Sequence, residues 1–359
     1  MAHKTFKVQA AAQLLATTVD TVRRMADRFE ITVARETAGT KTRLFSLENI
    51  FAIASHRAAT QAKVVRAGPI IVTTYASKAG AGSTTIASNL GVLLALRGFR
   101  VLLVDLDPDA GLTRSFGYHP DLTDADLVGT SLDRSMVIDH HFGDLLSDDH
   151  ADSVVLADVL KLPYGHFGPH LVPADLQLFQ LDAAQVRDEC SHRNSRPSIR
   201  TFIERGRSGK NPRFDFSKYD VVLFDAPPTI SGATFGVFDA TDHLVSSVSV
   251  DGYFGKALQL LSRLLEGQRE SHGRSPELTL VGNRFSLQRM HSIGSVASAP
   301  GALARAWLDR GIPYVDILHD SQSATAGLPL ILYAPAEPGT SDVRACVESL
   351  LERFGLVSL

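Results

Sequence analysis

The sequence predicts a doubly wound α/β fold on a mainly parallel sheet, and three observations support this. Short apolar runs alternate along the chain with stretches of helical periodicity, as strands and crossover helices do in such folds. A glycine-rich loop at residues 77–85 joins one predicted strand to the following helix. Two other apolar runs end in an aspartate, at Asp105 and at Asp225. Because ligands bind at the carboxyl ends of parallel strands, these features predict one shared site.

Composition excludes several classes of protein. The 359 residues are 44% hydrophobic and 21% charged, which is ordinary for a globular protein. No apolar run has the length needed to cross a bilayer, and the first residues lack the apolar core of a signal peptide. Two cysteines, Cys190 and Cys346, provide neither a disulfide framework nor metal-ligand spacing. We therefore expect a cytoplasmic protein that does not bind a membrane.

The charge is unevenly distributed. Residues 1–66 contain 11 Lys and Arg against 5 Asp and Glu, a net charge of +6, so the total of −3 leaves −9 for residues 67–359. We expect a small basic domain with its linker at 1–66 and a larger acidic domain at 67–359. Such a basic domain suits a polyanionic partner, although an ordinary solvated surface is the alternative.

The basic segment is predicted to contain two helices, a small hairpin and a third helix. These predicted elements are helices at 8–15 and 19–29, strands at 31–33 and 44–45 around a hairpin tip at 36–41, and a helix at 47–57 capped by Ser46. This order resembles the winged helix-turn-helix of the MerR-like family, which also precedes the ATPase domain in many plasmid ParA proteins. The alternative is a helical dimerisation module with an exposed basic face.

The resemblance implies DNA binding. A recognition helix at 19–29 would enter a major groove, and basic residues there and in the wing would contact phosphates. The residues implied near the groove are Thr18, Thr21, Arg23 and Arg24, and those implied in phosphate contacts are Arg24, Lys41 and Arg43.

Residues 70–109 organise the rest of the chain. A strand at 70–75 leads into the glycine-rich loop, a helix at 86–97 and a second strand at 100–104. Glycines let backbone N–H groups turn inward, and the helix directs its positive end at the same place. Together they form an anion site, and a Ser or Thr hydroxyl at the end of the loop can hold Mg²⁺.

This loop resembles the deviant Walker A loop of the ParA/MinD family of ATPases. The family pattern Lys-Gly-Gly-x-Gly-Lys-Thr-Thr aligns with Lys78-Ala-Gly-Ala-Gly-Ser-Thr-Thr85. The signature lysine of the family is therefore present as Lys78, whereas Ser83 replaces the ordinary P-loop lysine.

Three further segments fit the same family. Asp105-Leu-Asp107-Pro-Asp109 is similar to its Asp-x-Asp-Pro-Gln-Gly-x-x-Thr pattern, with Asp109 in place of the glutamine. The apolar run that ends at Asp225 and continues into Pro-Pro resembles the Walker B strand. Asn283 follows a predicted strand at 278–281 and matches the family asparagine that contacts the adenine edge.

The resemblance implies ATP and Mg²⁺ as cofactors, with the nucleotide held between two protomers. It assigns Lys78 to the phosphates of the partner protomer and Asp107 to orienting the attacking water. The implied nucleotide contacts are Gly80, Ala81, Gly82, Ser83, Thr84, Thr85 and Asn283. The implied metal-supporting residues are Thr84, Asp105 and Asp225.

Ser83 removes one fixed positive charge from each site, and three outcomes remain open. The site hydrolyses ATP slowly with help from the partner's Lys78, binds ATP without useful turnover, or no longer binds nucleotide. The retained Thr84, Asp105, Asp107 and Asp225 argue against the last outcome.

The resemblance therefore implies a ParA-like plasmid or chromosome partition protein, associated with the nucleoid. ATP would drive homodimerisation and non-specific DNA binding, a ParB-like centromere-binding protein would be the partner, and the N-terminal domain would bind its own operator. The competing class is a non-enzymatic DNA-binding regulator with a degenerate ATPase body. A MinD-like membrane ATPase is disfavoured because residues 348–359 contain only one basic residue, Arg353.

Overall fold

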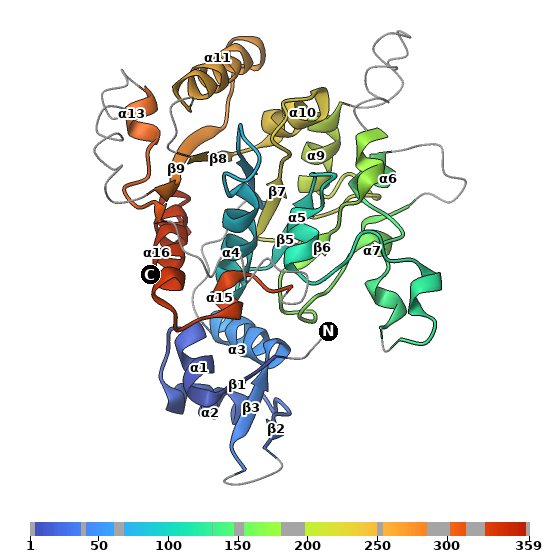
Figure 1. The fold of residues 1–359 in the computed structure, drawn as a ribbon, viewed down its shortest axis with the longest axis vertical. Helices are drawn as coiled ribbons and strands as arrows, with labels where there is room; N and C mark the ends of the chain where they lie inside the picture. Colours follow the sequence, from blue (N-terminus) through green and yellow to red (C-terminus); the bar gives the residue numbers. More distant parts are fainter. Residues whose placement is uncertain are drawn as a thin grey trace.

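The computed structural model shows a parallel sheet covered by helices, with a smaller N-terminal region packed at one end (Figure 1). It describes residues 4–36, 41–60, 68–130, 132–146, 154–180, 198–249, 254–285, 302–313 and 327–356. The strands are β1 (Thr5–Lys7), β2 (Ala34–Arg35), β3 (Arg43–Ser46), β4 (Ile70–Tyr75), β5 (Val101–Asp105), β6 (His170–Val172), β7 (Val221–Asp225), β8 (His243–Ser249), β9 (Glu277–Phe285) and β10 (Ile312–Pro313). The longer helices are α1 (Val8–Leu14), α2 (Val19–Arg28), α3 (Leu47–Ala59), α4 (Ser83–Leu96), α9 (Ile199–Arg207), α10 (Gly232–Ala240), α11 (Phe254–His272) and α16 (Pro338–Arg353). The shorter helices are α5 (Gly111–Ser115), η1 (Asp124–Leu127), η2 (Arg134–Met136), α6 (Phe142–Leu146), α7 (Leu156–Val159), η3 (Leu176–Leu178), α13 (Ala302–Ala306) and α15 (Leu330–Tyr333).

The large sheet has seven strands in the order β10-β9-β8-β4-β7-β5-β6, and every pairing within it is parallel. The strand before the glycine-rich loop, β4, lies between β7 and β8. In the register, Asp225 pairs with Thr74 on one side and with Asp105 on the other. The predicted doubly wound α/β fold is confirmed, and the two aspartates lie side by side at the carboxyl edge.

Helices cover both faces of this sheet. Along β4 and β5, Val72 and Leu103 join the apolar cluster that includes α4 and α16, whereas Ile71 and Leu102 join the cluster that includes α9 and α10. Because both faces are buried, the central strands are almost continuously apolar rather than alternating.

Several element boundaries differ from those predicted. Gly82, at φ 91°, is the N-cap of α4, so the helix begins at Ser83 rather than at residue 86. Strand β9 continues to Phe285, which places Asn283 inside the strand instead of after it. The strand predicted at 31–33 is wrong, because the Ile31 N–H donates back to the Ala26 carbonyl at 2.9 Å as α2 ends.

The N-terminal region has the predicted order of helices, with one strand that was not predicted. The three-residue β1 pairs with β3, and β3 pairs with β2, in an antiparallel sheet. Ser46 begins α3 through a capping box with Asn49, in which each side chain accepts from the other residue's N–H at 3.1 Å. Residues 37–40 of the predicted hairpin tip lie outside the described residues, as do residues 61–67 of the linker expected at 60–68.

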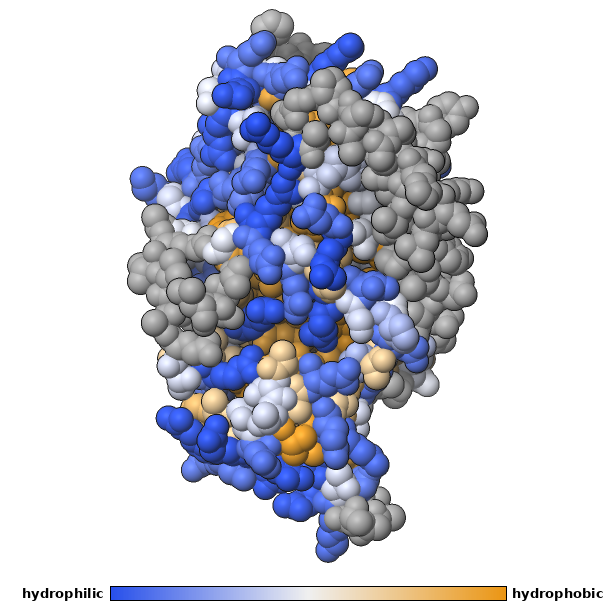
Figure 2. Space-filling model, turned by 90° about the vertical axis from the view of Figure 1, so that its left-hand side faces the viewer, coloured by the Kyte–Doolittle hydropathy of each residue, from blue (hydrophilic) through white to orange (hydrophobic). Residues whose placement is uncertain are grey.

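This N-terminal region packs directly on the body. The ring of Phe51 on α3 stacks on Tyr164 at 5.5 Å, and the Gln13 amide donates to the Pro335 carbonyl at 3.2 Å. One cluster of buried apolar residues runs from α1 and α3 into α4. Figure 2 shows a mostly hydrophilic face, with apolar atoms visible between the polar side chains. Because they share that apolar cluster, the N-terminal region and the body bury the surfaces through which they contact each other.

Gly98 ends α4 at its contact with α3. It has φ 84°, and the Gly98 and Phe99 N–H groups donate to the carbonyls of Ala95 and Leu94, a Schellman arrangement. A Cβ at Gly98 would lie 2.2 Å from the Cβ of Ala58 and 2.9 Å from the backbone oxygen of Ala54. Only glycine satisfies both the backbone conformation and the close approach.

We therefore expect Gly98→Ala to lower the free energy of unfolding by about 2–5 kcal/mol, as the sum of backbone strain and overpacking. Urea unfolding followed by circular dichroism measures this. Gly129→Ala is the matched control, because Gly129 also has positive φ, 77°, but no atom lies within 4 Å of its added Cβ. Equal losses in the two variants would contradict tight packing of α3 on α4.

Candidate functional site

The glycine-rich loop and the start of α4 form the centre of the candidate site. Gly80 and Gly82 have φ of 74° and 91°, a conformation that glycine adopts at little cost. The 14-residue helix α4 begins immediately afterwards, so the N–H groups of its first turn and its positive end face the loop. Lys78 is exposed, and Ser83 and Thr84 are half-buried in the first turn. Because position 83 has no lysine, backbone dipoles supply the positive potential at the start of α4.

Asp225 joins this loop to the neighbouring strand. Its Oδ2 accepts a hydrogen bond from the Thr84 hydroxyl at 2.7 Å, and its Oδ1 accepts one from the Thr74 hydroxyl at 2.8 Å. Burial, followed by the charge of Asp105, raises the pKa of Asp225 to about 8. A carboxylate and a threonine hydroxyl in contact are hard oxygen donors of the kind that Mg²⁺ prefers.

Asp105 holds the loop that follows β5. Its Oδ2 accepts from the Thr113 N–H at 2.8 Å and from the Thr113 hydroxyl at 2.7 Å, and its Oδ1 accepts from the Asp107 N–H at 3.1 Å. Burial raises its pKa to about 7, and these hydrogen bonds act in the opposite direction. The Asp105 carboxylate therefore fixes the backbone that presents Asp107.

Asp107 is half-buried, and burial raises its pKa. Its Oδ1 accepts from the Asp109 N–H at 3.0 Å. Ala110 adopts φ 53° before α5, at the position where the resembled pattern has glycine. A Cβ added to Gly111 would lie 3.3 Å from the Thr84 side chain, so this segment contacts the P-loop helix directly.

The structure thus brings Lys78, the loop residues, the three aspartates and Asn283 to one edge of the sheet. Asn283 is buried, and its amide donates to the Ala81 carbonyl at 2.5 Å. It lies within β9, two residues before the end of the strand, and its amide nitrogen bonds the loop.

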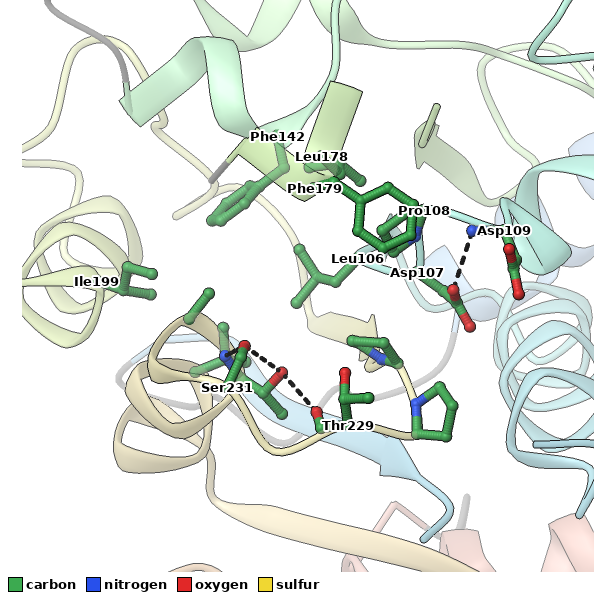
Figure 3. A pocket seen from close by; sticks show the side chains of 15 residues that line it. Leu106, Asp107, Pro108, Asp109, Phe142, Leu178, Phe179, Ile199, Thr229 and Ser231 are labelled. Atoms are coloured by element: carbon green, nitrogen blue, oxygen red, sulfur yellow. Dashed lines mark hydrogen bonds between the residues drawn. The ribbon is translucent and has the colours of Figure 1, made fainter. Parts of the chain in front are cut away.

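A pocket of about 200 Å³ lies beside Asp107, and no glycine-rich-loop residue lines it. Figure 3 shows Phe142, Leu178 and Phe179 on one side and Thr229 and Ser231 on another. Its walls are largely apolar, with the carboxylates of the loop after β5 at one rim. The pocket therefore adjoins the candidate site without being its anion-binding part.

Three residues of the site were not predicted from the sequence: Thr74, Thr113 and Ser247. Thr113 occupies the threonine position of the resembled Asp-x-Asp-Pro pattern, so that pattern contained a signal for it. Thr74 and Ser247 lie within buried strands, where only strand order shows what they face. The Ser247 hydroxyl donates to the Ala81 carbonyl.

The residues predicted to contact DNA lie on α2 and around the hairpin. The Thr18 side chain caps α2, accepting from the Thr21 N–H at 3.2 Å, and the two threonine hydroxyls lie 2.9 Å apart. Arg23 and Arg24 are exposed. Arg43 forms an ion pair with Asp27 at 2.8 Å, and Lys41 is exposed beside it in sequence with φ 51°.

These residues are distant from the glycine-rich loop. Helix α4 runs from that loop to α3, a length of about 21 Å for its 14 residues (Figure 1).

Within the described ranges, no helix combines the length and apolar character required to cross a membrane.

Comparison with known proteins gives a family match and several relatives. The model of an AAA domain family matches residues 70–271. A putative replication protein A of Rhizobium rhizogenes is 28% identical over 256 residues, which are 68% of this chain and 58% of that protein. A second such protein, from Sinorhizobium fredii, is 31% identical over 48% of this chain and 37% of its own length. This chain therefore spans less than two thirds of the length of these first relatives, 58% of one and 37% of the other.

A third relative is covered almost completely. The chromosome-partitioning ATPase Soj of Thermus thermophilus is 27% identical over 77% of this chain and 93% of its own length.

Solved structures share the fold at low sequence identity. A partition protein has a TM-score of 0.59 at 18% identity, over 98% of this chain and 92% of its own. A plasmid partition protein of Borrelia burgdorferi bound to AMPPNP has a TM-score of 0.56 at 16% identity, over 79% of this chain and 99% of its own. Cobyrinic acid a,c-diamide synthase of Mycobacterium smegmatis, with ADP and magnesium, has a TM-score of 0.56 at 19% identity, over 80% of this chain and 96% of its own.

Proposed function

This chain belongs to the ParA/Soj family of AAA-domain P-loop ATPases, and we propose that it is a plasmid or chromosome partition protein whose dimerisation is controlled by ATP. The single observation that carries the proposal is the contact between Thr84 and Asp225 at the start of α4, with Asp107 on the adjacent loop. This arrangement unites an anion site, two hard metal ligands and a carboxylate that can orient water. Those are the parts that phosphoryl transfer requires.

The proposed roles follow from this geometry. The N–H groups of residues 80 and 82–85 would bind phosphate oxygens, and Thr84 and Asp225 would hold Mg²⁺. Asp105 would support them by fixing the Asp107 loop. The family resemblance assigns Lys78, which is exposed, to the nucleotide of a second protomer. The Mg²⁺ ion would neutralise part of the negative charge on the phosphates. This site needs that neutralisation because Ser83 has no positive charge. A homodimer, DNA and a ParB-like protein are the proposed partners.

Calorimetric titration with ATP in the presence of Mg²⁺ tests this function. We expect the native chain to bind, and we expect Thr84→Ala to weaken Mg²⁺-ATP binding by about tenfold because a metal ligand is lost. The same variant should bind ATP in EDTA as the native chain does, since the backbone anion site remains. Absence of binding by the native chain would contradict the proposal.

We propose further that residues 1–66 form a winged helix-turn-helix domain with its linker and that residues 67–359 form the ATPase domain. Supporting this are the α1–α2 pair, the β2–β3 hairpin that follows it, and the exposed Arg23 and Arg24 on α2. Through this domain the protein would bind its own operator and repress the partition genes.

Arg24→Ala tests the operator function. Arg24 is exposed on α2, and one fewer phosphate contact should lower operator affinity and reduce the slope of log K against log salt by about 1. Fluorescence anisotropy at several salt concentrations, on DNA from upstream of the gene, measures both quantities. Arg205→Ala, an exposed arginine on α9, is the control and should leave the slope for this DNA unchanged. An unchanged affinity and slope for Arg24→Ala would remove α2 from DNA recognition.

Ser83 favours a second candidate function, a DNA-binding regulator whose ATPase body binds nucleotide without turning it over. The two functions differ in one measurement. A partition ATPase releases phosphate faster when DNA and a ParB-like partner are added, whereas the regulator shows ATP-dependent operator binding and no phosphate release.

A further inference from the structure

Two side chains from the sheet bond to one carbonyl of the glycine-rich loop. The Asn283 amide on β9 and the Ser247 hydroxyl on β8 both donate to the Ala81 oxygen, the first at 2.5 Å. Each donor is only 2% exposed. In the register of β8 and β9, Asn283 pairs with Ser249, two residues beyond Ser247. The two donors therefore lie on the same face of the sheet, directly against the loop.

This carbonyl controls the direction of the next N–H group. The described peptide bonds are trans, so the C=O of Ala81 and the N–H of Gly82 point in opposite directions within one plane. Because the sheet side chains hold the Ala81 oxygen inward, the Gly82 N–H must face outward. Outward is the side on which an anion meets the start of α4.

The Asn283 side chain also packs against Gly82 and leaves no room for a Cβ there. A Cβ at Gly82 would lie 1.9 Å from the Asn283 Nδ2, so the amide packs against the bare Cα. Asn283 must present its NH₂ group here, because the Ala81 oxygen can only accept. One of the two N–H donors of this amide is thus engaged by the loop.

We propose that Asn283 and Ser247 are positioning residues of the P-loop, which align its N–H groups for the phosphates of a nucleoside triphosphate whatever its base. This rests on the proposed nucleotide binding. It differs from the role implied by resemblance, in which Asn283 contacts the adenine edge. The alignment matters more in this chain than where a lysine is present, since Ser83 offers a hydroxyl donor but no positive charge at that position.

Binding affinities for three ligands distinguish the two roles of Asn283, contact with the base and positioning of the loop. We would titrate ATP, GTP and inorganic tripolyphosphate, each with Mg²⁺, into the native chain, Asn283→Ala and Ser247→Ala. Positioning predicts that each variant weakens all three ligands by a similar factor of about ten. Ser246→Ala is the matched control, because Ser246 is equally buried on the same strand but faces the opposite side of the sheet, and it is expected to change none of the affinities. A loss confined to ATP in Asn283→Ala would overturn the proposal in favour of adenine recognition.

Hydrogen exchange of the nucleotide-free protein gives a readout independent of ligands. Asn283→Ala and Ser247→Ala should speed exchange at the amides of residues 81–83, while amides of β4 and β7 keep native rates and report an intact fold. Native exchange rates in the loop of both variants would overturn the proposal. If the native chain binds none of the three ligands, the proposed function fails, and this exchange experiment still decides whether the two side chains order the loop.

Discussion

Ser83→Lys is expected to raise the rate of ATP hydrolysis by a factor on the order of 10³, the size that one positive charge on the transferring phosphoryl group contributes in related chemistry. Ser83 is the first residue of α4 and is half-buried beside the loop. At this end of α4 the native chain offers only partial charges, equivalent to about half an elementary charge. Thr84, Asp107 and Asp225 are already in place, so the substitution supplies a missing part to an assembled site.

Single-turnover ADP formation in acid-quenched samples, measured with Mg²⁺-ATP and DNA, is the appropriate assay because it reports chemistry rather than product release. Ser83→Gln is the control, since glutamine adds a long side chain without charge and should remain near the native rate. If Ser83→Gln and Ser83→Lys accelerate equally, the effect is one of shape. If Ser83→Lys gives no acceleration, the native site does not lack a charge, and a contribution from the partner's Lys78 becomes the leading explanation.

The second large effect concerns pH. Without Mg²⁺ and nucleotide, the free energy of unfolding should fall as pH rises from 5 to 8. Burial raises the pKa of Asp105 to about 7 and that of Asp225 to about 8, whereas an unfolded aspartate has a pKa of about 3.9. The folded state therefore retains protons that the unfolded state has lost. The stabilisation is complete below about pH 4 and is lost as pH rises through 7 and 8, with a slope of at most about 1.4 kcal/mol per pH unit for each group.

Asp225→Asn removes one of these groups while nearly keeping its shape. We expect its unfolding free energy to depend on pH about half as steeply as that of the native chain. We also expect it to exceed the native value at pH 8, where the native site holds two neighbouring carboxylates. Urea titrations in EDTA at pH 5, 6, 7 and 8 measure this. Asp309→Asn, at an exposed carboxylate, should follow the native profile. A native profile that is flat or rises with pH would contradict the assigned protonation.

The same substitution should act oppositely on ligand binding. An amide is a weaker ligand for Mg²⁺ than a carboxylate, so Asp225→Asn should gain stability at pH 8 and lose affinity for Mg²⁺-ATP. This exchange of stability for binding is common at functional sites, where groups are held in environments that they do not favour on their own.

The sequence by itself determined the fold class and the location of the site. Apolar runs of strand length, separated by helices, admit only parallel pairing with crossovers, and the glycine-rich loop and both strand-ending aspartates must then meet at the carboxyl edge. Thr84 and Asp225 were placed there by their positions relative to predicted strands. Local signals also identified the capped helix α3, because the Ser46–Asn49 contact spans only four residues.

The tertiary structure alone decided which side chains face one another. Asn283 bonds a carbonyl 202 positions earlier in the chain, and Gly98 meets α3 of the N-terminal region. Neither contact has a local pattern, because each depends on strand order, on register and on which helix covers which face. A one-residue change of register would turn Asn283 to the opposite face of the sheet, and periodicity in the sequence does not resolve that difference.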